Sequence, residues 1–309
     1  MIGPPLQTAA AVRGAGVGTD AVAPTAAPLT SSSEVVEGPD VGGERGTRQR
    51  ALLRLRGDIS GRMRIVLGVV GMLSLLAFWQ LAATVLSSGS FLVPTPIETW
   101  QALVELQQSG DLRADLTASL QRIGIGYGIS MAIGIVIGIL LASFRSVEAF
   151  LEPQIGFLRY IPASALTPLF LLWLGIDESP KIALIVMGTV FFNILMIADV
   201  ARAVPQDLVN ASYTLGAGRL TVLRRVVLPH SYPGIIDVAR INLAAAWLML
   251  VVAELLAAEE GLAFRVVRAQ RFRNVDTMFA VLIVFGLIGI VSDLALRALR
   301  RRTAPWATA

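Results

Sequence analysis

The sequence predicts an all-α membrane protein that crosses the bilayer about six times. Three observations support this fold class: the 309 residues are 55% hydrophobic and only 16% charged, the mean hydropathy is +0.69, and the apolar residues gather into long stretches. An ordinary soluble domain carries more charge and fewer apolar residues. The apolar stretches are about as long as helices that span a bilayer.

Each predicted span is an apolar stretch close to the length of about 20 residues that a bilayer requires. The six stretches are residues 65–86, 119–143, 151–174, 181–201, 232–258 and 275–296. The third stretch contains Pro162 and Pro168. Because proline frees backbone carbonyls that lipid cannot satisfy, we expect this broken span to pack inside protein rather than against lipid.

The first residues of the chain differ in composition from the rest. Residues 1–50 are rich in Gly, Ala, Pro, Ser and Thr and show no apolar periodicity. Such a segment buries too little apolar surface to offset the entropy of ordering it. We therefore expect residues 1–60 to be a disordered cytoplasmic tail, residues 61–303 to form the transmembrane domain, and residues 304–309 to be a short C-terminal tail. A secretory signal is not expected, because the first apolar stretch follows residue 64 and is long enough to span.

The arginines predict the orientation of the spans. Seven arginines between residues 45 and 64 precede the first span and four between residues 297 and 302 follow the sixth, so both termini should be cytoplasmic. The loop at 202–231 then also lies inside. The loop at 259–275 should lie outside, yet it carries Arg265, Arg268, Arg271 and Arg273. One explanation is that an outer loop tolerates basic residues once the two ends of the chain fix the topology. The other is that these arginines form a positive outer vestibule that attracts an anion.

The composition excludes several kinds of site. The chain has no cysteine and one histidine, His230, so a disulfide, a thiol nucleophile or a histidine-rich metal site cannot form within one chain. The isoelectric point near 10.1 suggests nucleic acid, but most basic residues flank apolar stretches, as topology signals do. The sequence also lacks the Gly-x-x-x-x-Gly-Lys-[Ser/Thr] loop that cradles ATP phosphates. We therefore expect no cofactor, no catalytic residues and no nucleic-acid partner for this chain.

The polar loop at 202–231 is the most informative segment. It reads Val-Pro-Gln-Asp-Leu-Val-Asn-Ala-Ser-Tyr-Thr-Leu-Gly-Ala-Gly over residues 204–218 and ends at Leu228-Pro229. Loops of this length in compact proteins are usually functional. Pro205 and Asp207 suit a first helical turn, and Gly216 or Gly218 suits a helix end. We expect a short helix, a glycine stop, a second helix and a proline at which the chain re-enters the membrane.

The spacing in this loop resembles the EAA loop of bacterial ABC-importer permeases. That motif is Glu-Ala-Ala, three residues, Gly, nine residues, Ile, one residue and Leu-Pro. Here Asn210-Ala211-Ser212 is followed at the same spacing by Gly216, Val226 and Leu228-Pro229. Asn210 replaces the usual glutamate and Ser212 the second alanine, so one charged contact is missing.

Other segments are similar to the permease subfamily for nitrate, bicarbonate, taurine and aliphatic sulfonates. They are Leu92-Val93-Pro94-Thr95-Pro96, Ser119-Leu120-Gln121-Arg122-Ile123, residues 161–169 with Leu172-Trp173-Leu174-Gly175, Ala253-Glu254, Gly261-Leu262 and Pro305-Trp306. The resemblance covers residues 64–306. Ala263 stands where the family usually has a second glycine, so the resemblance does not imply that the loop after the fifth span turns as it does in relatives.

The resemblance implies the type I ABC-importer (MetI-like) fold in the bacterial inner membrane. It implies a second permease copy, two cytoplasmic ATPase subunits that bind ATP and Mg, and a periplasmic or lipid-anchored substrate-binding protein. The cargo would be a small anion such as a sulfonate, taurine, nitrate or bicarbonate; a small organic nutrient such as a thiamine precursor is the alternative. The residues implied in ATPase docking are Pro205, Asp207, Leu208, Asn210, Ala211, Ser212, Leu215, Gly216, Leu228 and Pro229. Of these, Leu208, Ala211, Ser212 and Leu215 share one helical face.

Polar and tryptophan residues inside the spans are candidates for the translocation path, because polar groups in a membrane are costly and usually functional. The candidates are Ser164, Thr167, Trp173, Asn193, Arg240, Trp247 and Glu254. For Arg240 we favour a structural ion pair with Asp237 or Asp199 over substrate contact. For Glu254 we expect a pair with an arginine such as Arg265 or Arg268, or a hydrogen bond in the helix packing.

The second span contains two Gly-x-x-x-Gly patterns, Gly124 with Gly128 and Gly134 with Gly138, which favour close helix approach. We favour packing within the chain over dimerisation for both.

Three other functions remain as rivals to an ABC permease. An ion-coupled secondary transporter would need intramembrane acid relays or internal repeats, a membrane enzyme would need a cluster of catalytic groups, and a scaffold would need neither.

Overall fold

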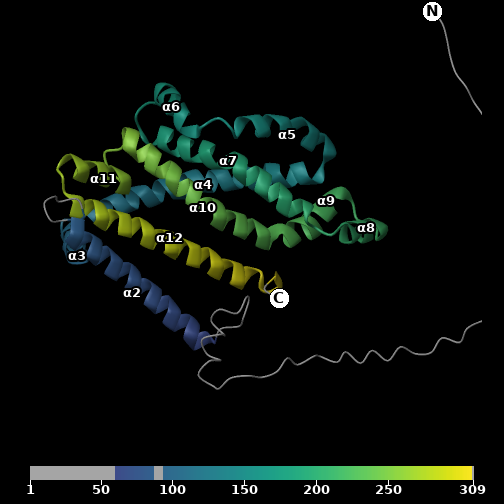
Figure 1. Ribbon diagram of the computed structural model, residues 1–309. Coiled ribbons are helices and arrows are strands. Elements are labelled where there is room, and N and C mark those ends of the chain that lie inside the picture. Colours follow the sequence, from purple (N-terminus) through teal and green to yellow (C-terminus); the bar gives the residue numbers. More distant parts are fainter. Residues whose placement is uncertain (1–59, 87–92, 308–309) are drawn as a thin grey trace, which may run out of the picture. The chain divides into compact units, whose positions relative to one another are not determined.

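The computed structural model describes residues 60–86 and 93–307, and in these residues it contains helices and no strand (Figure 1). The described residues from Ile65 onward form one compact unit. Apart from residue 60, the predicted disordered tail lies outside the described residues. The all-α fold class is confirmed for the described residues.

The helices follow one another with short connections. They are α2 (Gly61–Leu86), α3 (Pro96–Gln108), α4 (Asp111–Ser143), α5 (Arg145–Leu158), η1 (Ala163–Leu166), α6 (Thr167–Leu174), α7 (Glu178–Arg202), α8 (Gln206–Thr214), α9 (Arg219–Val222), the π-helical η2 (Leu223–Val227), α10 (Leu228–Ala257), α11 (Leu262–Arg271), α12 (Val275–Thr303) and η3 (Pro305–Ala307). Among the described residues, five helical segments are long and apolar enough to cross a membrane: Gly61–Val85, Asp111–Ser143, Glu178–Arg202, Arg219–Leu255 and Val275–Thr303. The bent pair α5 and η1–α6 makes a sixth if it counts as one span, which agrees with the predicted number.

The predicted break in the third span is a bend of 80° between α5 and η1–α6. Pro162 stands directly before η1 and Pro168 lies in the first turn of α6, where a missing N–H costs no helical hydrogen bond. Within one chain, however, this span is not enclosed by protein as expected. Phe157 and Trp173 are 70% and 66% exposed, because α5 buries only Ile155 and α6 buries only Thr167 and Phe170.

The helical core is the pair α4 and α7, with α10 packed beside it (Figure 1). Gly134 and Gly138 of α4 face α7: a Cβ on Gly134 would lie 2.8 Å from Asn193 Cβ, and one on Gly138 would lie 2.7 Å from the Ile194 carbonyl oxygen. The prediction of packing within the chain is therefore confirmed for this pattern. The prediction is wrong for Gly124 and Gly128, because no atom of another described segment lies within 4 Å of a Cβ built at either position.

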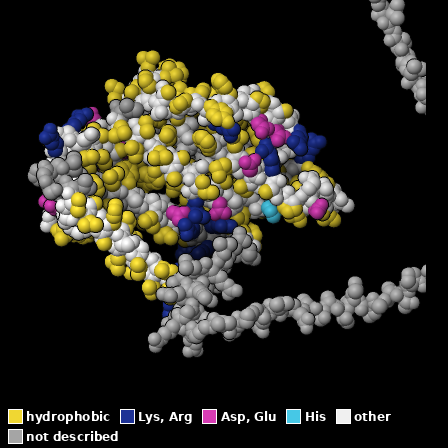
Figure 2. Space-filling view, viewed as in Figure 1, with side chains coloured by type: hydrophobic (Ala, Val, Ile, Leu, Met, Phe, Trp, Pro, Cys, Tyr) yellow, Lys and Arg dark blue, Asp and Glu magenta, His cyan; other side chains and the backbone are white. Residues whose placement is uncertain are grey.

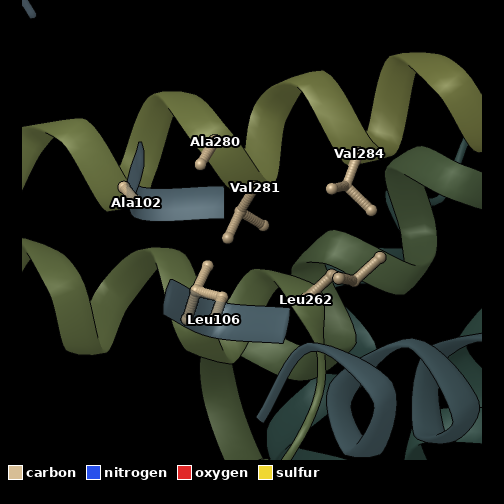
Figure 3. Close-up of a cluster of buried hydrophobic side chains, with 6 residues drawn as sticks. All are labelled: Ala102, Leu106, Leu262, Ala280, Val281 and Val284. Carbon is tan, nitrogen blue, oxygen red and sulfur yellow. The ribbon is translucent and has the colours of Figure 1, made fainter. Parts of the chain in front are cut away.

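A second cluster joins α3 to α11 and α12, two helices that lie far from α3 in the sequence (Figure 3). Its buried side chains are Ala102, Leu106, Leu262, Ala280, Val281 and Val284. α2 is attached at the same end of α12, where the Trp79 ring stacks on Phe279 with centroids 5.9 Å apart. Elsewhere α2 is exposed, as expected of a helix whose apolar side chains face lipid or another chain.

Figure 2 shows hydrophobic side chains over the middle of the visible face, with charged side chains gathered near α11, near α5 and beside the C-terminal half of α12. This division matches a bilayer core bounded by polar regions.

The chain returns toward the membrane differently from the prediction. The second helix does not stop at the proline where re-entry was expected, because residues 219–257 form one continuous helical run that contains Pro229. Pro229 cannot donate to the carbonyl of Arg225, and the preceding turn, η2, opens to a π-helix in which Leu228 N donates to Leu223 O. The π turn therefore accommodates the proline without ending the helix.

Candidate functional site

The loop after α7 forms the helix–glycine–helix unit that the sequence indicates. Pro205 is the N-cap of α8 and Asp207 lies in its first turn, where a negative charge suits the helix dipole. Gly216 ends the helix with φ +82°, while its N–H donates to Tyr213 O at 2.9 Å and that of Ala217 donates to Ser212 O at 3.0 Å. Gly216 rather than Gly218 is thus the left-handed stop; Gly218 is the extended residue before α9.

The surface of α8 is open to a partner. All nine residues of α8 are exposed or half-buried, and Leu208 and Leu215 on its shared face are 47% and 88% exposed. Ala211 and Ser212 lie between them, and the Ser212 hydroxyl donates back to Leu208 O at 2.7 Å, so it presents little polar character outward. Asn210 accepts a hydrogen bond from Gln206 on the helix itself. A small exposed apolar stripe on a polar loop is typical of a docking surface.

A cavity of about 710 Å³ lies against the inner side of the α8–α9 unit. Its walls come from the end of α4, the start of α5, the end of α7, and from Val209, Tyr213, Val222 and Leu223 of the unit itself. The base of the unit is fixed by Arg202, which pairs with Asp199 at 3.1 Å and with Glu148 of α5 at 2.9 Å. The unit is therefore anchored at its ends and has space beneath it.

The seven candidate path residues lie in different places. Ser164 and Trp173 are exposed on η1 and α6, and Thr167 is buried with its hydroxyl donating to Ser164 O. Trp247 packs edge-on against Phe285 with centroids 6.0 Å apart, and its Nε1 has no partner among the described residues.

Asn193 is fully buried in the core rather than on an open surface. Its Nδ2 donates to Ser130 Oγ at 2.8 Å, its Oδ1 accepts from Asn242 Nδ2 at 2.7 Å, and Thr189 donates to the same serine. This chain of hydrogen bonds joins α4, α7 and α10. In this structure Asn193 holds three helices together.

Arg240 pairs with Asp237 at 3.3 Å, as predicted, and also with Asp293 of α12 at 2.7 Å. The alternative pair with Asp199 is wrong, because Asp199 contacts Arg202. Glu254 pairs with an arginine and hydrogen-bonds in the helix packing, as predicted, but the arginine is neither of the two named examples. Its carboxylate, 1% exposed, accepts from Arg122 Nη1 at 2.9 Å and from Ser119 Oγ at 2.6 Å rather than from Arg265 or Arg268.

Arg265 is not part of an open vestibule. It is 9% exposed, and its guanidinium donates to Asp115 at 2.6 Å and to Asp111 at 2.9 Å. Burial lowers the pKa of Arg265, but the hydrogen bond and ion pair with Asp115, reinforced by Asp111, outweigh burial and raise it. The other three arginines of this loop, Arg268, Arg271 and Arg273, are exposed.

Sequence reasoning missed several members of this ion-paired region. Glu178 accepts two hydrogen bonds from Arg122 and one from Lys181, and Asp115 is 1% exposed beside Arg265. The available signal was position: these charged residues stand in or near the first turns of two spans, where a charge without a partner would be costly.

Comparisons with known proteins agree with this arrangement. The family model described as "Binding-protein-dependent transport system inner membrane component" matches residues 134–305. An ABC transporter permease protein of Brucella melitensis biotype 1 is 36% identical over 220 residues, which are 71% of this chain and 89% of that protein. The taurine transport system permease protein TauC of Escherichia coli K12 is 35% identical over 82% of this chain and 94% of that protein. The SsuC permease for aliphatic sulfonates transport of Bacillus subtilis 168 is 32% identical over 75% and 84%.

Two solved structures share the fold. A bacterial ABC transporter involved in the import of the acidic polysaccharide alginate has a TM-score of 0.57 at 14% identity, with 84% of this chain and 97% of that chain covered. The inward-facing MetNI methionine ABC transporter has a TM-score of 0.55 at 20% identity, with 62% and 95% covered. At these identities the likeness concerns the fold alone.

Proposed function

Since the chain belongs to the family of binding-protein-dependent transport system inner membrane components, we propose that it forms half of the translocation path of an ABC importer and moves a small anion into the cytoplasm. It is a transport subunit of the inner membrane with the type I importer fold. ATP and Mg would bind to partner ATPase subunits. The observation that carries the proposal is α8: an exposed helix with the EAA spacing, seated above a cavity.

In this proposal α8 is the contact with the ATPase. Its apolar face, Leu208, Ala211, Ser212 and Leu215, would enter a groove on the ATPase, and the small middle residues would allow close approach. Asn210 would hydrogen-bond where relatives place a glutamate. Pro205, Asp207 and Gly216 would fix the two ends of the helix, and Leu228 with Pro229 would connect it to α10.

The transport cycle would be alternating access. Two copies of this chain would enclose the path, which accords with the apolar surface that α5 and α6 leave exposed in one chain. Closure of two ATPase subunits on ATP would move both α8 helices and open the path outward to a substrate-binding protein, periplasmic or lipid-anchored. Hydrolysis would return it inward. Both chain termini and α8 would lie on the cytoplasmic side, as the arginines indicate.

The proposed cargo class is a small sulfonate or a similar anion. Relatives are named for taurine and for aliphatic sulfonates, and the exposed Arg268, Arg271 and Arg273 would draw an anion to the outer side. Ser164, Trp173 and Trp247 are the remaining candidates for contact within the path. The alternative, a small organic nutrient, is supported by a relative named as a formylaminopyrimidine permease, ThiX, at 28% identity. Uptake of radiolabelled taurine but not of formylaminopyrimidine by the reconstituted importer would support the anion; the reverse result would support the alternative.

We expect Gly216→Pro to abolish co-purification of the ATPase and to lower uptake at least about tenfold. Proline cannot adopt φ +82°, and it removes the N–H that donates to Tyr213, so the helix end would unwind. Gly218→Pro is the matched control, because φ at Gly218 is −75° and already suits proline. Retention of the ATPase by Gly216→Pro, in a chain that still inserts in the membrane, would contradict the docking role of α8.

A further inference from the structure

Three segments that α8 docking does not use meet at one place in the fold. They are Ser119 and Arg122 on α4, Glu254 near the end of α10, and Gly261 with Leu262 at the start of α11. Ser119 and Glu254 are 135 positions apart in the sequence, yet the serine hydroxyl donates to the carboxylate at 2.6 Å. We call these residues, together with Asp115, Glu178 and Lys181, the ion-pair knot.

Arg122 is the centre of the knot. Its guanidinium, 5% exposed, donates to Glu254 Oε1 at 2.9 Å, to both carboxylate oxygens of Glu178 at 2.5 and 2.8 Å, and to the Glu260 carbonyl at 2.6 Å. These acceptors belong to α10, α7 and the turn before α11. One side chain of α4 therefore binds three other segments, and the planar guanidinium fixes their directions as well as their distances.

The knot also supplies the N-terminal cap of α11. The first N–H groups of a helix have no acceptor within the helix. Here Gly261 N donates to Asp115 at 2.9 Å, Leu262 N to Ser119 Oγ at 2.9 Å, and Ala263 N to Glu254 Oε2 at 2.8 Å. Every acceptor comes from α4 or α10, so the start of α11 is bound to these helices rather than capped by its own loop.

The close approach depends on Gly261. Its φ is +135°, and a Cβ built on it would lie 2.5 Å from the Glu254 carboxyl carbon. The carboxylate thus lies directly on the turn backbone.

The charged side chains of the knot pair with one another or with Arg265 beside them. Arg122 and Lys181 balance Glu178 and Glu254, and the buried pair of Asp115 with Arg265 lies beside them. Buried groups that are already paired would resist binding a passing anion, because a new contact would break an existing pair. The knot is therefore built to hold helices and not to bind cargo.

The knot lies at the opposite end of α4 from the cavity beneath α8. That cavity touches Ala142, and the twenty residues from Arg122 to Ala142 span about 30 Å of helix. A displacement that begins at α8 reaches the far ends of α4, α7 and α10 through these helices.

We propose that Arg122 and Glu254 are positioning residues that bind the ends of α4, α7 and α10 remote from α8 to the start of α11, so that these ends move as one body during transport. The movement rests on the proposed function, whereas the hydrogen bonds that join α4 to α11 do not depend on it.

The first test measures distance and needs no disruptive variant. Since the chain contains no cysteine, cysteines at the exposed positions Thr117 of α4 and Gln270 of α11 give one pair of spin labels within each copy of the chain. In the importer reconstituted with its ATPase, we expect one narrow Thr117–Gln270 distance distribution, identical without nucleotide and after trapping with ATP and vanadate. A change in the mean distance larger than the width of the distribution would overturn the proposal.

The second test removes the charges. Arg122→Gln and Glu254→Gln each leave a buried partner charged, so we expect a broadened Thr117–Gln270 distribution and at least about tenfold lower uptake. The double variant removes both charges and should restore part of the uptake. Variants that retain the ATPase should hydrolyse ATP without further stimulation by the loaded binding protein. Arg113→Gln, which removes an exposed guanidinium from the same end of α4, is the control and should change neither readout.

The two proposals fail differently. If the chain binds no ATPase, the proposed function fails, whereas the label distances in the chain alone in lipid nanodiscs still report the tie between α4 and α11. A distribution in Arg122→Gln that is as narrow as in the parent, or uptake equal to the parent, would overturn the positioning role.

Discussion

We expect Gly138→Leu to prevent the chain from accumulating as folded protein. A Cβ at this position would lie 2.7 Å from the Ile194 carbonyl oxygen and 3.0 Å from Ile197 Cβ. A leucine therefore forces α4 away from the backbone of α7. Overpacking a core costs about 1–3 kcal/mol when side chains can yield, and we expect at least about 3 kcal/mol here because a backbone atom blocks the space.

The matched control lies on the same helix. Gly128→Leu introduces the same side chain where no atom of another described segment lies within 4 Å of the new Cβ. We expect Gly128→Leu to match the parent in membrane yield. We also expect the two proteins to lose half of their size-exclusion peak after heating to the same temperature. Similar losses in both variants would mean that glycine matters through helix flexibility rather than through contact with α7.

This contrast shows what the sequence can and cannot predict. Gly124 with Gly128 and Gly134 with Gly138 are the same pattern in a stretch, residues 123–143, in which nearly every side chain is apolar. Where nearly all side chains are apolar, the alternation of apolar and polar residues does not indicate which of the two patterns faces α7. The presence and approximate length of the spans follow from apolar length alone, and the bend in the third span follows from its prolines.

The α8–α9 unit could be predicted because its cues are local. Proline, an early acid and a glycine stop each act within one turn of helix. The partner of Glu254 could not be predicted in the same way. Arg265 and Arg268 are eleven and fourteen positions away, whereas the actual partner, Arg122, is 132 positions away and becomes a neighbour only when α4 packs beside α10.

Among substitutions of charged residues, we expect that of Asp115 to lower the stability of the chain most. This carboxylate is 1% exposed and accepts from Arg265 Nε and from the N–H of Gly261. Asp115→Ala would leave a buried guanidinium without its nearer partner and a buried N–H without an acceptor. Removing one member of a buried ion pair costs about 3–5 kcal/mol, so we expect a large fall in the thermal stability of the purified chain.

Asp111 provides the control, because it pairs with the same arginine but its side chain is 46% exposed. Water can replace an exposed partner, and we expect Asp111→Ala to cost less than about 1 kcal/mol. Asp115→Asn separates the two roles of the buried acid, since an amide oxygen can still accept from Gly261 N but carries no charge for Arg265. If the charge dominates, Asp115→Asn should resemble Asp115→Ala; if the cap on α11 dominates, it should resemble the parent. Equal losses from Asp115→Ala and Asp111→Ala would show that burial does not set the strength of these pairs, and would remove the basis for treating this end of the bundle as rigid.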